Sequence, residues 1–246
     1  MHVILTGATG FVGSIALDVM LNDDAVTKVT IISRKEVKQA EGQAKVNVIL
    51  QDDLSKYDDA TLAKLKGASG CVWALGPPYM SVSKEEYEYA HIELPAIAAK
   101  IFSTLRDRFN FVYVSHDKCD EHKNLYAYGI KDRAEEGLLE VAKTTPSLKV
   151  YAVRPALIDS SSHEGATRWR TAPLTMTKRL TEWVLIPLFR VLGSELLGTS
   201  QDLGIVMVDL AIGDGAELTV KGVARGGRCV GVAGMAELAN AKRAEE

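Results

Sequence analysis

A glycine-rich octapeptide, TGATGFVG at residues 6–13, most constrains what this chain can fold into. It directly follows a short β-branched run and opens a helical pattern at residues 11–21. Gly7 permits a tight turn, Gly10 lets the backbone approach an anion, and Gly13 lets the helix pack closely on the strand. The free N–H groups of the loop and the helix dipole favour a bound pyrophosphate. The sequence therefore predicts a strand, a phosphate-binding loop and a helix at the start of the chain.

Short apolar runs alternate with helical patterns through the first 155 residues. The runs are continuously apolar, which is typical of parallel strands with helices over both faces. This alternation predicts right-handed crossovers and an α/β fold with a doubly wound parallel sheet. The predicted strands are residues 3–6, 29–33, 46–50, 71–75, 111–115 and 149–153, and the predicted helices are residues 11–21, 60–66, 85–105 and 132–143.

Three motifs together resemble those of the short-chain dehydrogenase/reductase superfamily: residues 6–13, the pair Asp53-Leu54, and Ala-Leu-Gly at residues 74–76. The likeness is to its extended and atypical branches, which include proteins like nucleoside-diphosphate-sugar epimerases and nitrogen-metabolite-repression regulators. It is specific over residues 1–155. The resemblance implies a Rossmann fold and a nicotinamide dinucleotide. It also implies that Asp53 and Leu54 contact the adenine and that residues 74–76 line the nicotinamide ribose.

The end of the second predicted strand favours NADP(H) over NAD(H). A site that prefers NAD usually has an acidic side chain there, whereas this chain has Ser33, Arg34 and Lys35 before the first acid, Glu36. Two cations and a hydroxyl suit a 2′-phosphate, which a guanidinium binds in a bidentate way. NADP (NADPH) is thus the predicted cofactor. The candidate cofactor-binding residues are Gly7, Thr9, Gly10, Phe11, Val12, Gly13, Ser33, Arg34, Lys35, Asp53, Leu54, Ala74, Leu75, Gly76, Lys131 and Pro155.

The catalytic segment departs from the pattern of the superfamily. The resemblance implies a serine after the fifth strand and a Tyr-x-x-x-Lys on the next helix. The lysine binds the nicotinamide ribose and lowers the pKa of the tyrosine, which exchanges a proton with the substrate. Ser115 and Lys131 match the serine and the lysine, but Ala127 stands at the tyrosine position between Tyr126 and Tyr128.

Tyr128 is the better substitute for the missing tyrosine. At ~100° per residue it lies about 60° around a helix from Lys131, whereas Tyr126 lies about 140° away. His116 beside Ser115 is another candidate acid or base at neutral pH. The candidate catalytic residues are Ser115, His116, Tyr126, Tyr128 and Lys131, and no metal site is predicted.

The strand–helix rhythm ends after Pro155. We predict a single NAD(P)-binding domain over residues 1–246, with a dinucleotide-binding core in residues 1–155. A mostly helical, substrate-side part follows in residues 156–246. Within it we predict helices in residues 167–197 and 204–210, a strand in residues 228–232, a solvated helix end in residues 237–246, and substrate contacts from His163, Arg168 and Trp169.

The composition limits the classes of partner that we expect this chain to bind. The 246 residues carry 29 Lys+Arg against 32 Asp+Glu, a net charge of −3, so no basic field is available to bind nucleic acid. The three widely spaced cysteines form no CxxC and suggest a reducing, cytoplasmic compartment. Neither a targeting segment nor an apolar run of membrane-spanning length is present, so we expect no membrane contact. The expected partner is a small-molecule substrate, bound by a monomer or homodimer.

Three functions remain open at this point. The first is an NADP(H)-dependent oxidoreductase that acts on a carbonyl or hydroxyl of a small organic substrate, such as a secondary metabolite. The second is a non-redox enzyme (an isomerase, lyase or cyclase) on the same scaffold. The third is a catalytically silent regulatory protein that senses NADP. The fate of the missing tyrosine separates the first from the other two.

Overall fold

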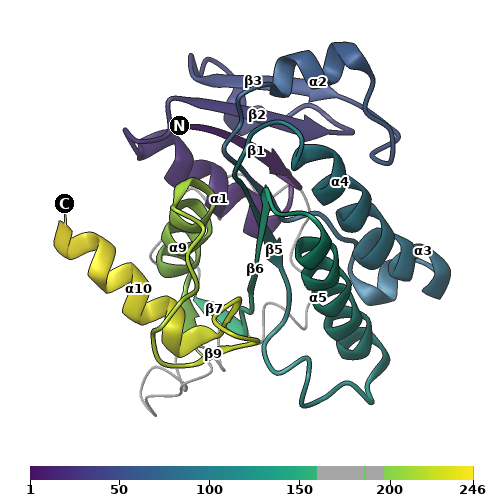
Figure 1. Ribbon diagram of the computed structural model, residues 1–246, viewed down its shortest axis with the longest axis vertical. Coiled ribbons are helices and arrows are strands. Elements are labelled where there is room, and N and C mark those ends of the chain that lie inside the picture. The colour runs from purple at the N-terminus through teal and green to yellow at the C-terminus, as the bar shows by residue number, and fades with distance from the viewer. Residues whose placement is uncertain (160–185, 187–196, 246) are drawn as a thin grey trace.

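A computed structural model describes residues 1–159, 186 and 197–245. Within these residues an eight-stranded sheet has the order β3-β2-β1-β4-β5-β6-β10-β9 (Figure 1). Neighbouring strands are parallel except β9 and β10, which are antiparallel. The strands are β1 His2–Thr6, β2 Lys28–Ser33, β3 Val46–Leu50, β4 Gly70–Trp73, β5 Phe109–Val114, β6 Leu148–Val153, β9 Val223–Ala224 and β10 Cys229–Val230. The predicted doubly wound parallel sheet is confirmed.

Helices cover both faces of this sheet (Figure 1). Val3 and Leu5 on β1 join a core with residues of α1, α9 and α10, whereas Ile4 joins a second core with residues of α2, α4 and α5. Both faces of β1 are thus buried, which explains its continuous apolar run. The helices are α1 Phe11–Asn22, α2 Asp59–Leu65, α3 Lys84–Glu88, α4 Leu94–Phe102, α5 Tyr126–Thr144, α9 Ser200–Ile212 and α10 Val232–Glu245, with short helices η1 Lys38–Ala40 and η2 Tyr79–Ser81.

The single helix predicted over residues 85–105 is instead interrupted. A π-helical turn, η3 Tyr89–Glu93, separates α3 from α4, and the N–H of Leu94 donates to the carbonyl of Tyr89. Pro95 in the first turn of α4 has no N–H to donate to His91 four residues earlier. The Tyr113 hydroxyl donates to that free carbonyl at 3.3 Å. A proline and a tertiary partner therefore stabilise the altered turn.

Helix α5 begins at Tyr126, earlier than the predicted start at residue 132. The first two turns of α5 therefore carry Tyr126, Tyr128 and Lys131, three of the five candidate catalytic residues. The predicted strand 71–75 is also shorter, since β4 ends at Trp73. Residues 74–76 thus form a loop at the carboxyl end of the strand, where open α/β sheets bind ligands.

The last part of the chain completes the central layers and is not only helical. Helix α9 packs on α1, β4 and β5, and β10 pairs with β6. A second, parallel pair is formed by β7 Leu157–Asp159 and β8 Leu197–Thr199. The predicted helix 167–197 and the candidate substrate contacts His163, Arg168 and Trp169 lie almost wholly outside the described residues. No helix in the described ranges is both long and apolar enough to cross a membrane.

Candidate dinucleotide-binding site

The glycine loop after β1 has the close contacts that its sequence predicts. Gly7 has a φ of +73°, and a Cβ added there would lie 2.3 Å from the carbonyl oxygen of Ala74. A Cβ at Gly13 would lie 2.1 Å from the carbonyl oxygen of Gly7. The N–H of Gly10 donates to the same carbonyl at 2.8 Å. Only glycine fits at positions 7 and 13, so the loop can hold the N-terminus of α1 open to a pyrophosphate.

A cavity of about 440 Å³ opens beside this loop. It brings together nine of the candidate cofactor residues, from the ends of β1, β2, β3 and β4. These nine are Gly7, Thr9, Gly10, Arg34, Asp53, Leu54, Ala74, Leu75 and Gly76. The remaining candidates, Phe11, Val12, Gly13, Ser33, Lys35, Lys131 and Pro155, are not among the lining residues.

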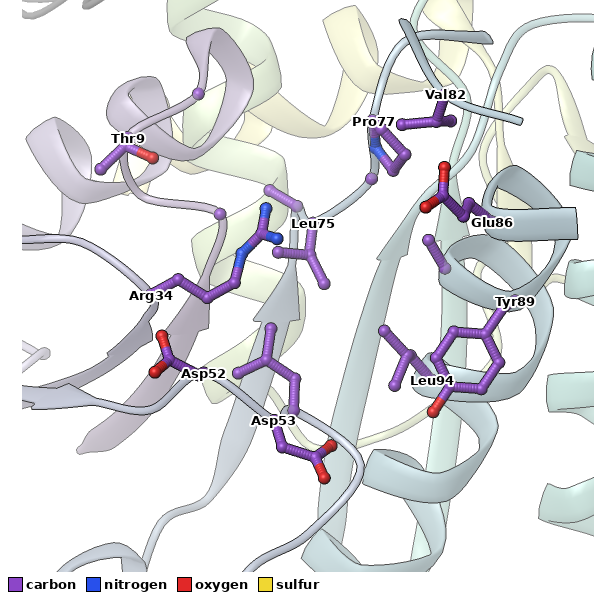
Figure 2. A pocket seen from close by; sticks show the side chains of 16 residues that line it. Thr9, Arg34, Asp52, Asp53, Leu75, Pro77, Val82, Glu86, Tyr89 and Leu94 are labelled. Carbon is purple, nitrogen blue, oxygen red and sulfur yellow. The ribbon is translucent and has the colours of Figure 1, made fainter. Parts of the chain in front are cut away.

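Arg34 has an exposed side chain and extends into this cavity from the side of β2 (Figure 2). The preceding Ser33 is engaged in the turn instead, since its hydroxyl donates to the carbonyl of Lys35 at 2.7 Å. Of the three residues predicted to hold a 2′-phosphate, Arg34 alone lines the cavity in the described structure.

Asp53 lines the cavity, but its carboxylate is already bound. It accepts hydrogen bonds from the side chain and backbone N–H of Ser55, and Lys56 lies 2.9 Å away. The hydrogen bond from Ser55, reinforced by Lys56, holds the pKa of Asp53 well below its usual range. Leu54 is buried beside it and offers an apolar surface. The adenine contact of this pair stays a prediction, for which Leu54 offers the apolar surface.

Sequence reasoning missed the opposite side of the cavity. This side consists of Val82, Glu86, Tyr89, Ala90 and Leu94, from the segment that contains α3, η3 and the start of α4. In Figure 2, Tyr89 lies across the cavity from Arg34. The four-residue spacing of 82, 86, 90 and 94 was the available signal, but a helical stripe does not say which surface it faces. Asp52 and Pro77 were also missed.

Lys131 lies at the carboxyl end of β5. Its ammonium donates to the carbonyl of Val114 at 2.9 Å and lies 4.8 Å from the centre of the Tyr113 ring. Because Trp73 pairs with Tyr113 in the sheet, Val114 neighbours the cavity residue Ala74. Burial lowers the pKa of Lys131 to about 7, although the charge of Glu135 acts in the opposite direction.

The two tyrosines beside Ala127 contact different neighbours. The Tyr126 hydroxyl lies 3.3 Å from both the carbonyl of Lys84 and the carboxylate of Glu88, which ties it to α3. The Tyr128 ring lies 4.5 Å from the ring of His116 and 5.7 Å from that of His122.

Within the described residues the Tyr128 hydroxyl forms no hydrogen bond, so it remains available. The Ser115 hydroxyl lies 3.8 Å from the Cys119 sulfur in a buried position. The Tyr79 ring packs on the rings of Tyr87 and Tyr126.

A buried ion cluster anchors α5 behind this site. Glu135 has a fully buried side chain, and Arg154 binds both of its oxygens, at 2.9 and 2.6 Å. Nε of Arg225, in the turn between β9 and β10, lies 3.1 Å from the same carboxylate. The thiols of Cys119 and Cys229 donate to it at 3.3 and 3.4 Å. Arg154 thus orients α5, and the next residue, Pro155, lines a separate cavity beside β7 and β8.

Comparisons with known proteins identify a relative by sequence and solved structures with a similar fold. No protein-family model matches it. It is 50% identical over 254 aligned positions to the leucinostatins biosynthesis cluster protein T of Purpureocillium lilacinum, covering 96% of this chain and 94% of that one. The PhqB reductase domain of Penicillium fellutanum superposes with a TM-score of 0.65 at 15% identity, over 98% of this chain and 69% of that one.

A third comparison extends the likeness to an epimerase. UDP-glucuronic acid 4-epimerase from Bacillus cereus, solved in complex with NAD, superposes with a TM-score of 0.65 at 14% identity, over 100% of this chain and 83% of that one. At such identities the likeness is one of fold. The chain has the Rossmann fold of short-chain dehydrogenases/reductases, and it belongs to the family of leucinostatins biosynthesis cluster protein T.

Proposed function

We propose that this protein is an NADP(H)-dependent oxidoreductase that acts on a carbonyl or hydroxyl of a small secondary metabolite. The observation that carries the proposal is the cavity between the glycine loop and α3, because its loop has no room for side chains and suits a dinucleotide. The relative in a leucinostatin biosynthesis cluster and the reductase domain that shares the fold support this reading. The experiment that tests it is titration of the purified protein with NADPH and NADH, followed by assay against a panel of aldehydes and ketones.

Each residue of the site has a definite task in this proposal. The N–H groups at the N-terminus of α1 bind the pyrophosphate, and Arg34 binds the 2′-phosphate. Lys131 reaches the nicotinamide ribose from the end of β5. When bound, the dinucleotide supplies or accepts the hydride. Tyr128 transfers the accompanying proton, since its hydroxyl has no other partner in the described part of the chain.

Replacing Arg34 with alanine should weaken NADPH binding much more than NADH binding. Only NADPH loses a charge-assisted contact to a phosphate, worth roughly 1.5–3 kcal/mol. Calorimetric titration of both cofactors checks this. Lys38→Ala is the control, since Lys38 is an exposed cation on η1 that does not line the cavity. Equal losses for the two cofactors in Arg34→Ala would show that Arg34 does not read the 2′-phosphate.

Replacing Tyr128 with phenylalanine should lower turnover by ~10²–10⁴-fold, the usual cost of losing a general acid. NADPH affinity should stay unchanged, because Tyr128 does not line the cavity. Steady-state rates of NADPH oxidation and equilibrium titration measure the two effects separately. Tyr126→Phe is the matched comparison, since it removes a hydroxyl already engaged with α3. Equal rates in wild type and Tyr128→Phe would exclude Tyr128 as the proton donor.

Ala127 favours a second candidate, a non-redox isomerase, lyase or cyclase on the same scaffold. No phenol occupies the position one turn before Lys131, and Tyr126 contacts α3 instead. Such an enzyme would convert its substrate without net consumption of NADPH. Product analysis alongside cofactor absorbance distinguishes the two candidates.

A further inference from the structure

His91 is a buried polar side chain that the proposed chemistry leaves without a role. It lies in the π-helical turn η3 and is only 3% exposed. The Tyr87 ring packs against it with the ring centres 4.3 Å apart. Its ring nitrogen Nε2 lies 3.3 Å from the carbonyl oxygen of Pro77. Pro77 lines the dinucleotide cavity, so this contact joins η3 to the loop after β4.

The imidazole also lies directly behind Gly76. A Cβ added at Gly76 would be 2.0 Å from Cε1 of His91 and 2.8 Å from both ring nitrogens. The backbone of Gly76 has no positive φ that would favour glycine. Glycine is required at this position because the His91 ring leaves no space for a Cβ. The loop that the superfamily resemblance assigns to the nicotinamide ribose is therefore shaped against this side chain.

The protonation state of His91 is defined by its surroundings. Burial lowers its pKa to about 3, and the nearby Lys131 charge acts in the same direction. A neutral imidazole carries one N–H, and the contact with the Pro77 carbonyl requires that hydrogen on Nε2. Nδ1 is then a bare acceptor with no partner among the described residues. Buried polar atoms without a hydrogen-bond partner are rare in native proteins, and a functional role is one reason for them to be retained.

The π-helical turn explains how the ring reaches this place. Tyr89 and Ala90 line the cavity, whereas His91, the next residue, points behind its wall. The Tyr113 hydroxyl donates to the His91 carbonyl and anchors the turn on β5. Turns of this kind often occur at functional sites.

We propose that His91 is a positioning residue, which supports the Gly76–Pro77 segment and so sets the geometry of the nicotinamide end of the site. This inference rests on the proposed function, because it assumes a bound nicotinamide dinucleotide. His91 itself need not touch the cofactor. Its packing behind Gly76 and its hydrogen bond to Pro77 restrict the loop after β4 to one conformation. This restriction lowers the entropy cost of binding the dinucleotide.

The test compares a whole dinucleotide with its adenosine half, 2′,5′-ADP, in the full-length protein. His91→Ala should weaken NADPH on the order of tenfold, equivalent to ~1.4 kcal/mol, while 2′,5′-ADP changes by less than about twofold. His91→Gln should restore most of the affinity, since its amide can still donate to Pro77. Phe102→Leu, buried at the far end of α4, is the structural control and should shift both ligands equally.

A double-variant cycle tests the contact itself. Gly76→Ala should weaken NADPH because its Cβ meets the imidazole, and His91→Ala in the same chain removes that obstacle. The double variant should therefore bind NADPH at least as well as Gly76→Ala alone. If the two positions acted independently, the affinity losses of the two single variants would multiply in the double variant.

Several outcomes would overturn the inference. Equal losses of NADPH and 2′,5′-ADP in His91→Ala would mean a general packing role, and multiplied losses in the double variant would mean no coupling. If the wild type binds NADH but not NADPH, the comparison uses NADH and 5′-ADP, and equal losses of these two in His91→Ala overturn the inference in the same way. A wild type that binds neither dinucleotide overturns the proposed function, and this inference with it.

Discussion

Replacing Gly7 with alanine should weaken dinucleotide binding by about 100-fold or more and destabilise the protein. The new Cβ would lie 2.3 Å from the Ala74 carbonyl oxygen and 2.9 Å from the Leu75 nitrogen, both backbone atoms that cannot rotate away. The loop must therefore move, and its N–H groups lose the pyrophosphate. Two charge-assisted hydrogen bonds at about 1.5–3 kcal/mol each correspond to an affinity loss of about 100-fold or more.

Gly42 provides a matched control for this substitution. It has the same φ of +73°, but a Cβ there would have nothing within 4 Å. Gly42→Ala should cost only the left-handed strain, about 1–2 kcal/mol, and leave NADPH affinity unchanged. Urea unfolding and calorimetric titration of both variants separate strain from close approach. If Gly7→Ala and Gly42→Ala behaved alike, the tight contact between Gly7 and the loop after β4 would not be needed for binding.

The second large effect is expected at Glu135. Replacing Glu135 with glutamine should reduce the free energy of unfolding by about 3–5 kcal/mol, the usual cost of breaking a buried ion pair on one side. Arg154 and Arg225 would then share a neutral amide in a position where the native side chain is fully buried. Equilibrium unfolding in urea measures the loss.

A control for Glu135 lies on the same helix. Glu140 is 68% exposed and paired with Lys143, so Glu140→Gln should change stability by less than about 1 kcal/mol. A loss as small in Glu135→Gln as in Glu140→Gln would contradict the importance of the buried cluster.

The contribution of Glu135 should also depend on pH. Burial by itself raises the pKa of Glu135, but the hydrogen bonds and charge of Arg154 outweigh this and hold the pKa below its usual value. A carboxyl whose pKa is lower in the folded state stabilises the fold above its unfolded pKa, near 4.5. This contribution disappears as pH falls through the folded pKa. The difference between wild type and Glu135→Gln should therefore shrink below pH ~4.5 and stay constant near neutral pH.

Local patterns account for what could be predicted of the fold. The glycine loop lies in eight consecutive residues, and Gly10 and Gly13 contact Gly7 within the same strand–loop–helix unit, whereas Gly7 itself is confined by Ala74 after β4. The continuous apolar runs of β1 and β5 indicated strands buried on both faces, and the structure buries both. Helix ends were harder to predict: α5 begins at Tyr126, whose hydroxyl donates to the carbonyl of Lys84 on α3, a residue far away in the sequence.

In the candidate site, too, some residues could be predicted from local sequence and others could not. Arg34 could be identified because it directly follows β2, and strand ends face ligands in this fold class. The wall that carries Glu86 and Tyr89 could not, since a helical stripe of side chains suits a core as well as a cavity. The positions of Tyr126 and Tyr128 were equally hidden, because Glu88 and His116, which contact them, come from other segments.

The sequence by itself determined the α/β class, the parallel sheet, the tight glycine loop after β1 and the presence of a cation, Arg34, directly after β2. These features depend on residues that are neighbours along the chain. Only the tertiary structure decided the π-helical turn, the support of Gly76 by His91 and the burial of Glu135 between two arginines. Those depend on contacts across the chain, such as Tyr113 with His91 and Arg225 with Glu135. Hydrogen bonds and ion pairs of this kind form only after the sheet has brought distant strands together. They therefore cannot be predicted from any local sequence pattern.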